Sequence, residues 1–199
     1  MSPDFFDVVT RQRAHRAFSD RPVTDHDLAR LLDAAVHAPS AENRQPWEFV
    51  VVRDPHRRAA IGELMRRGWE ESGREFERGR LPRALFEDVE RGATGGIATA
   101  PVHVVVCADV ARGLEQTVGS SVFPAVQNLL LAATALGLGS ALTTIAVGYA
   151  HELAALLALP GHVRPVAVVP VGWPARPLGR PRRDPFGRHT HREVFGVPW

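Results

Sequence analysis

The chain has 199 residues, of which 45% are hydrophobic and 23% charged, a composition typical of a single globular domain. Its formal net charge is only +2, and its basic residues are spread along the chain. This distribution excludes the clustered basic stripe of a nucleic-acid-binding protein. All 24 basic residues are arginine, which excludes Schiff-base chemistry and a phosphate-loop lysine but leaves anion binding by guanidinium groups.

Other residue types exclude further classes of protein. A single cysteine, Cys107, excludes an intramolecular disulfide and a cysteine-rich metal site. We predict no metal centre, because His189 and His191 supply two ligands where three or four must converge. The N-terminus, MSPDFFDVVTRQR, lacks the order of a signal peptide. Polar residues and prolines interrupt the apolar segment 122–142, so we expect a buried helix, a cytoplasmic protein and no membrane partner.

The first third of the chain predicts helices around one strand. Residues 4–11 form a short helix, and Thr24 caps a second helix that ends before Pro39. The apolar run 48–53 has the length of a buried strand. Asp54-Pro55 then begins a helix that reaches about Gly73.

Residues 68–96 differ in composition from the rest. Arginine and glutamate alternate there, and the aromatic residues Trp69, Phe76 and Phe86 stand apart from one another. We predict a helical excursion or flap. The alternative is an ordinary solvated helix face, which has the same composition.

The remaining chain alternates again between strands and helices. We predict strands at 102–108, 140–145 and 165–171, and helices at 120–136 and 149–157. The helix at 120–136 is apolar on nearly all sides and is therefore expected to be buried on nearly all sides. Residues 172–199 are rich in proline and should form an extended arm. The alternation favours layers of helices and sheet within one domain, residues 1–199.

Two groups of arginines are candidates for binding an anion. The first group ends the first helix, and the second lies in the arm: Arg11, Arg13 and Arg16, then Arg180, Arg182 and Arg183. Forked hydrogen bonds from both groups could hold one phosphate. The alternative is two solvated basic patches. The chain has no nucleophile elbow, phosphate loop or dinucleotide fingerprint to suggest other chemistry.

Four segments, in this order, resemble motifs of the nitroreductase family of FMN-dependent oxidoreductases. They are QRAHRAF (12–18) with the following Arg-Pro-Val, APSAENRQPWEFVVV (38–52), SVFPAVQNLLLAATALGLGSALTTIA (121–146) and VVPVGWPARPLGRPRRDP (168–185). The chain departs from the family at Gln12, Arg13 and Ala14, where many members carry Arg-Arg-Ser. One arginine and one hydroxyl that contact phosphate are therefore missing.

The resemblance implies an α+β fold, with a mixed four- to five-stranded sheet flanked by helices. It also implies a homodimer with two FMN sites at the interface, each built from both chains. The residues implied to bind FMN are Arg13, Ala14, Arg16, Pro39, Ser40, Asn43, Gln45, Leu142, Thr143, Thr144, Arg180 and Arg182. Of these, Arg13, Arg16 and Arg182 are expected at the phosphate.

The loop between Pro39 and Trp47 would then lie along the flavin ring. Ser40, Asn43 and Gln45 can each donate and accept hydrogen bonds, as the edge of an isoalloxazine requires. The alternative is a turn in which Ser40 and Asn43 bond their own backbone.

The resemblance also implies an activity that needs no catalytic acid or base, because the cofactor carries the chemistry. NADH or NADPH would reduce FMN, and FMN would then reduce a small organic acceptor such as a nitro compound or quinone, in ping-pong order. Trp69, Phe76 and Phe86 are the predicted substrate contacts, and backbone groups near Thr143 and Thr144 would stabilise reduced flavin. Open alternatives are a flavin storage or sensor protein, or a flavoenzyme of the same fold that oxidises, dehalogenates or destroys flavin. The acceptor, and a donor among NADH, NADPH and a deazaflavin, also stay open.

Overall fold

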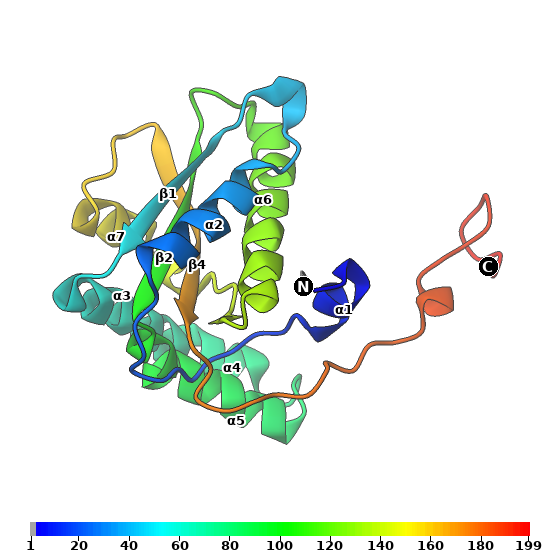
Figure 1. The fold of residues 1–199 in the computed structure, drawn as a ribbon, viewed down its shortest axis with the longest axis horizontal. Helices are drawn as coiled ribbons and strands as arrows, with labels where there is room; N and C mark the ends of the chain where they lie inside the picture. Colours follow the sequence, from blue (N-terminus) through cyan, green and yellow to red (C-terminus); the bar gives the residue numbers. More distant parts are fainter. Residues whose placement is uncertain (1–2) are drawn as a thin grey trace.

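Four strands form one sheet in the computed structural model, which describes residues 3–199. The strands are β1 (Trp47–Val52), β2 (Val102–Asp109), β3 (Gly139–Ser140) and β4 (Val163–Gly172), in the order β1-β2-β4-β3 (Figure 1). The predicted α+β class is confirmed. The pairing was expected to be mixed, but all three strand pairs are antiparallel. The one isolated parallel bridge of the described chain joins Ala14 to Ser140.

The two faces of the sheet are covered by different helices because β2 alternates its side chains. Val104 and Val106 belong to the core under α2 (Asp25–Val36) and α6 (Glu115–Ala135). Val105 and Cys107 belong to the core under α3 (Pro55–Gly68) and α7 (Ala150–Leu156). All eight residues of β2 are buried, so this strand forms the centre of both cores.

The predicted strand at 140–145 was wrong in length. Its pairing with β4 ends at Ser140, and Thr143 alone forms a further bridge, to Val168. The chain then enters the 3₁₀ helix η5 (Ile145–Tyr149). The β-branched residues here suit a strand, but the chain leaves the sheet to reach α7, and this tertiary requirement overrides the local preference.

Helix α6 begins at Glu115, five residues before its predicted start at Ser120. It is long and apolar enough to span a membrane, yet it packs against α2 and the sheet as a core helix. The expectation of burial on nearly all sides was wrong for a single chain. Phe123 is 42% exposed, because no element of the described chain covers that side of the helix.

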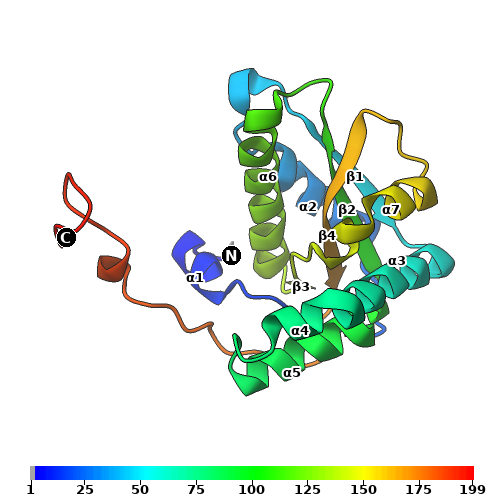
Figure 2. The same ribbon diagram turned by 180° about the vertical axis from the view of Figure 1, so that it is seen from behind.

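Residues 69–99 are helical except for a turn at 78–82, and they lie along the end of the sheet where β4 and β3 meet (Figure 2). They comprise the π-helical turn η2 (Trp69–Gly73), α4 (Arg74–Glu77), α5 (Arg83–Arg91), a second π-helical turn η3 (Gly92–Gly96) and η4 (Ile97–Thr99). We call residues 69–99 the flap.

The segment that follows α1 (Phe5–Arg11) and the start of the C-terminal arm meet beside β3. The His15 N–H donates to the Ser140 carbonyl at 2.9 Å, and the Ala175 N–H donates to the Ala17 carbonyl at 3.1 Å. The arm contacts the N-terminal segment again at Gly179 and Arg180 and then leaves the body of the protein, with one 3₁₀ turn at η6 (Phe186–Arg188) (Figure 1).

Candidate functional site

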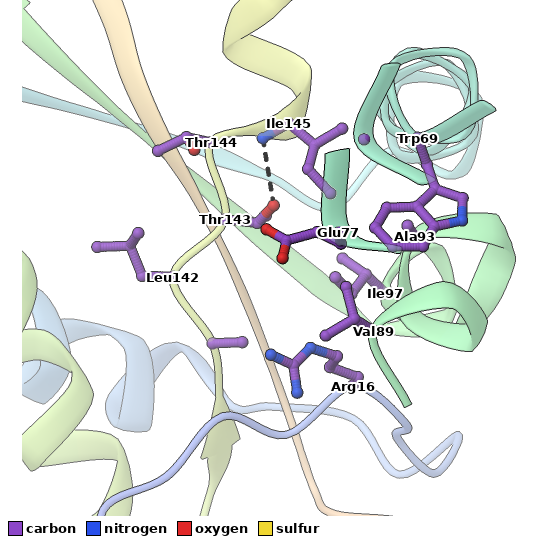
Figure 3. Close-up of a pocket in the computed structure, with 12 residues that line it drawn as sticks. Arg16, Trp69, Glu77, Val89, Ala93, Ile97, Leu142, Thr143, Thr144 and Ile145 are labelled. Atoms are coloured by element: carbon purple, nitrogen blue, oxygen red, sulfur yellow. Dashed lines mark hydrogen bonds between the residues drawn. The ribbon is translucent and has the colours of Figure 1, made fainter. Parts of the chain in front are cut away.

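A cavity of about 250 Å³ lies where the flap, the N-terminal segment and the chain after β3 meet (Figure 3). Its wall is mainly apolar, with a few polar groups that converge on it, as in ligand sites of proteins. The lining residues are Arg16, Trp69, Gly73, Glu77, Val89, Ala93, Ile97, Ala141, Leu142, Thr143, Thr144 and Ile145. Four of the residues predicted to bind FMN are therefore brought together within one chain: Arg16, Leu142, Thr143 and Thr144.

The segment after β3 lines this cavity and contains unused backbone donors. Thr143 is buried, and both its backbone groups bond Val168, at 3.0 and 2.9 Å. Its neighbours Leu142 and Thr144 are exposed. No hydrogen bond found among residues 3–199 uses the backbone N–H of Leu142 or Thr144. Thr143 thus fixes the segment while two unused donors flank it, an arrangement suited to stabilising negative charge.

Arg16 connects the N-terminal segment to the flap. Its guanidinium faces the cavity (Figure 3). It also donates to Asp88 of α5 at 2.8 Å. Glycines permit this close packing, because a Cβ on Gly96 would lie 2.3 Å from the Arg16 carbonyl oxygen. Any larger residue at position 96 would push the flap away from the cavity.

Arg13 points elsewhere, toward the arm. Its Nη1 donates to the Gly179 carbonyl at 2.6 Å, and its buried Nε has no partner among the described residues. Burial, and next the charge of Arg13, lower the pKa of His15 between the two arginines. Of the arm residues, Arg180 pairs with Asp7 at 2.8 Å, whereas the Arg182 side chain is exposed. Within one chain, Arg13 lies near residues 179–180, and Arg16 belongs to the cavity.

One of the three aromatic residues predicted to contact substrate lines the cavity. Trp69 does so, although it is only 2% exposed and its Nε1 has no partner in the described chain. Phe86 packs against Trp69, with ring centroids 5.5 Å apart, and does not line the cavity. Phe76 is 58% exposed beneath Arg80. The substrate roles of all three remain predictions.

Sequence reasoning missed Glu77, Val89 and Ile97 in the cavity wall. Ile97 is held from behind, since the Nε2 of buried His103 donates to its carbonyl at 3.0 Å. Burial lowers the pKa of His103 to about 4, so the ring is neutral at pH 7. Nothing in the sequence distinguishes these residues, because Glu77 and Val89 lie in a charge-rich segment and His103 in an apolar strand.

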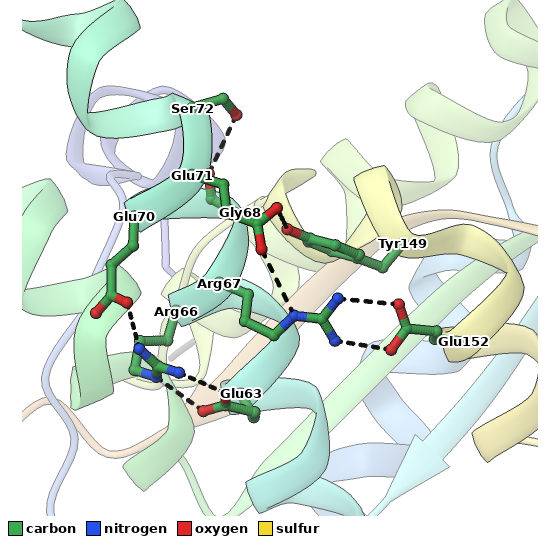
Figure 4. Close-up of polar contacts among 9 residues, drawn as sticks. All are labelled: Glu63, Arg66, Arg67, Gly68, Glu70, Glu71, Ser72, Tyr149 and Glu152. Atoms are coloured by element: carbon green, nitrogen blue, oxygen red, sulfur yellow. Dashed lines mark hydrogen bonds and ion pairs between the residues drawn. The ribbon is translucent and has the colours of Figure 1, made fainter.

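A group of polar contacts joins the end of α3 and the start of the flap to α7 and η5 (Figure 4). Arg67 donates to both carboxylate oxygens of Glu152, and the Tyr149 hydroxyl donates to Glu71 at 2.5 Å. The Glu71 hydrogen bond also raises the pKa of Tyr149. Gly68 allows the approach, because a Cβ there would lie 2.9 Å from an Ile145 methyl group. These contacts hold the walls formed by η2 and Ile145 together.

The predicted flavin loop, residues 39–47, has a strained backbone. Glu42, Asn43 and Gln45 all have positive φ, at 52°, 54° and 49°. The Ser40 hydroxyl accepts from the Gln45 N–H at 3.0 Å, as the alternative of a self-bonded turn requires. No hydrogen bond found among residues 3–199 involves the Asn43 side chain, so part of the loop's bonding capacity is unused.

This loop lies at the opposite end of α6 from the cavity (Figures 1 and 2). The Ala41 N–H donates to Ser121 Oγ near the start of α6, whereas β3 and the cavity follow its end at Ala135. At 1.5 Å per helical residue, Ser121 and Ala135 are about 20 Å apart. The structure therefore does not bring Pro39, Ser40, Asn43 or Gln45 to the cavity of the same chain.

Comparison with known proteins identifies the family of the chain. Residues 9–173 match the model of the nitroreductase family. The chain belongs to this family. An NADH dehydrogenase of Thermus thermophilus is 31% identical to it over 188 residues, which cover 84% of this chain and 85% of that protein. An iodotyrosine deiodinase of Thermotoga neapolitana is 30% identical over 190 residues, which cover 93% of this chain and 97% of that protein.

A solved structure supports the fold. The BluB-like flavoprotein of Clostridium difficile superimposes with a TM-score of 0.76 at 23% identity, covering 96% of this chain and 100% of that one. The protein is thus a nitroreductase-family enzyme, a flavoprotein oxidoreductase of the NAD(P)H-dependent class. The names of its relatives span more than one reaction, so family membership does not fix the acceptor.

Proposed function

We propose that this nitroreductase-family protein is a homodimeric, FMN-dependent oxidoreductase that takes hydride from NADH or NADPH. It delivers the electrons to a small organic acceptor, in ping-pong order. The observation that carries the proposal is the pair of unused backbone donors at Leu142 and Thr144, beside the cavity that Arg16 lines. Electron-rich oxygen and nitrogen atoms are the natural partners of such donors.

The residues present fit FMN. Unused backbone N–H groups suit a ring system that becomes negative on reduction, and the buried, partnerless Nε atom of Arg13 suits an anionic phosphate nearby. Bound FMN would supply the hydride and electron transfer. The chain itself would orient the ring through the 142–144 backbone and exclude water with the flap. Thr143 stays fixed by its two bonds to Val168.

Two copies of the chain are needed for a complete site. The cavity of about 250 Å³ falls below the roughly 300–1,000 Å³ of ordinary ligand pockets. The loop that should bind the ring edge lies at the far end of α6. Exposed apolar side chains on α1 and α6 offer a surface for a second copy: Phe5, Phe6, Val9 and Phe123. A partner chain could place its loop at this cavity.

The purified protein should be yellow and should release FMN when denatured. NADH or NADPH should bleach the bound flavin anaerobically, and an acceptor such as a nitro compound or quinone should restore its colour. Bleaching would argue against a storage or sensor role. A colourless protein that stays unliganded in excess FMN would overturn the proposal. Light scattering on dilution should show that FMN stabilises the dimer, because a ligand that binds only the dimer favours it by mass action.

Reductive dehalogenation is a second candidate, favoured by the likeness to the Thermotoga deiodinase over 93% of the chain. Release of halide from a halogenated phenol, with consumption of the reduced donor, would distinguish it from nitro or quinone reduction. The cytoplasmic location expected from the sequence remains a prediction.

A further inference from the structure

Glu77 is the one acidic residue in the wall of the cavity, and its surroundings leave it unneutralised. It ends α4 of the flap and is partly buried. Its carboxylate points into the cavity from the flap, whereas Leu142–Thr144 line the cavity from the chain after β3 (Figure 3). The chain therefore places a carboxylate over the surface where an acceptor must lie.

The basic residues near Glu77 are Arg16, Arg74 and Arg78, which form ion pairs with other carboxylates, and Arg80, which stacks on the Phe76 ring. Arg16, across the cavity, pairs with Asp88 at 2.8 Å. Arg74 pairs with Glu90 at 2.9 Å, and Arg78 pairs with Glu75 at 3.3 Å. None of the ion pairs found among residues 3–199 includes Glu77.

The balance of charge in the cavity follows from these pairs. Arg16 shares the Asp88 carboxylate with Arg91 and Arg176, so the wall carries a cation at Arg16 and, on the flap side, the separate negative charge of Glu77. The remaining wall is apolar or carries hydroxyl groups, and it screens a carboxylate less than bulk water does. A positive charge on a bound acceptor would be attracted to Glu77, and a negative charge would be repelled.

We propose that Glu77 selects acceptors that carry a positive charge beside a flat, reducible body. The apolar wall of Trp69, Ile97 and Leu142 would receive that body, while the carboxylate of Glu77 meets the cationic group. Glu77 is then a specificity-determining residue and takes no part in electron transfer. This inference rests on the proposed function, since it names the substrate class of the same cavity.

The test uses three nitrobenzenes of one skeleton, with a trimethylammonium-methyl, a hydroxymethyl or a carboxylate group in the para position. Intrinsic reactivity differs among them, so each kcat/KM of Glu77→Gln is divided by the wild-type value for the same compound. The cation should lose about three- to tenfold, the size of one partly screened ion pair. The anion should gain by a similar factor, and the neutral compound should stay nearly unchanged. Added salt should reduce both effects.

Glu70→Gln is the matched control, because Glu70 lies on the same flap, is exposed, does not line the cavity and pairs with the distant Arg66. It should leave all three ratios unchanged. Equal changes for the three acceptors in Glu77→Gln would overturn the inference, since they would show an effect on the flap and not on charge. A wild-type protein that binds no FMN, or passes no electrons to any of the three, overturns the proposed function and this inference with it.

Discussion

The two ends of α6 carry the two parts of the proposed site, and they satisfy their polar groups differently. At the cavity end, Thr143 is fixed by two backbone bonds, and Arg16 is fixed by Asp88. At the loop end, Glu42, Asn43 and Gln45 hold positive φ and are exposed. Such a conformation costs about 1–3 kcal/mol per residue and persists only where other contacts enforce it.

The difference shows which half of the site is complete within one chain. The cavity end is preorganised, because the flap, β4 and the N-terminal segment all hold it. The loop end presents strained backbone and an unused amide at Asn43 to a surface that its own chain does not cover. A strained, exposed loop is a feature of binding sites, so the loop should act on the cavity of a second copy.

Mixing two variants tests most directly whether the loop of one chain completes the cavity of the other. Arg16→Gln removes a group from the cavity, and Asn43→Ala removes one from the loop. Each homodimer should bind FMN about ten- to a hundredfold more weakly, the loss expected for a hydrogen bond to a charged or buried partner. After the two variants exchange subunits at random, half of the dimers are mixed. One of the two sites in each mixed dimer has both native residues, so about a quarter of all sites should bind tightly.

The recovery is measured by titrating FMN fluorescence before and after exchange. Mixing either variant with itself is the control and should restore nothing. If mixed dimers recover no tight sites, both residues serve one site from the same chain, and the loop would have to swing along α6 to reach it.

A second prediction concerns Arg182, which is expected to bind the FMN phosphate. Charge-assisted hydrogen bonds contribute roughly 1.5–3 kcal/mol each, so Arg182→Ala should weaken FMN about ten- to a hundredfold. Riboflavin lacks the phosphate, and its affinity should barely change. Arg182 is exposed within its own chain, as expected of an arm residue that works on a partner.

Both ligands should be measured at one salt concentration, with Arg180→Ala beside Arg182→Ala. Parallel losses for FMN and riboflavin would show that Arg182 supports the fold. If only Arg180→Ala weakens FMN binding, then Arg180, which lies near Arg13, is the arm residue that binds the phosphate.

A fall in pH should destabilise the cavity end of the molecule before the loop end, through protonation of His103. His103 has a folded pKa of about 4, below its ordinary 6.5, because burial disfavours the charged ring. A lowered pKa means that its contribution is fully present above pH 6.5 and is lost as the pH falls toward 4. The full shift corresponds to about 3 kcal/mol of unfolding free energy.

Denaturant unfolding from pH 7 to 4.5 measures this contribution. His103→Gln keeps a donor for the Ile97 carbonyl and removes the titration. The difference in unfolding free energy between the wild type and this variant should shrink as the pH falls. A difference that stays constant would show that His103 does not control acid stability.

The sequence predicted the parts of the fold that depend on local pattern. Apolar runs located β1, β2 and β4, and the Thr24 cap located α2. It could not predict that the pairing at 140–145 stops after Ser140, because the bend toward α7 is a tertiary requirement. The sequence also led us to expect burial on the side of α6 that carries Phe123, because the composition of an apolar helix does not reveal which neighbour covers each face.

The candidate site divides in the same way. The motif residues Arg16 and Leu142–Thr144 were predicted and do meet at one cavity. Glu77 was not predicted, because its orientation depends on how the flap packs. Phe76 is as aromatic as Trp69 but lies on the outer side of the same flap, a difference that depends on helical phase and not on residue type.

The smallest expected effect concerns the contacts that close the cavity beside η5. Tyr149→Phe removes the hydroxyl that donates to Glu71 and leaves the ring under Arg67 in place. Exposed polar contacts add little to global stability, so the unfolding midpoint should barely move. Local opening is more sensitive, because one fewer contact then holds η2 to η5. Backbone amides of Trp69–Gly73 should exchange hydrogen severalfold faster.

Glu70→Gln is the matched control, since it removes an ion pair to Arg66 within the same helical segment and none to η5. Equal acceleration in both variants would mean that the turn simply frays. Acceleration in Tyr149→Phe alone would show that the contact across the cavity holds the wall that Trp69 forms.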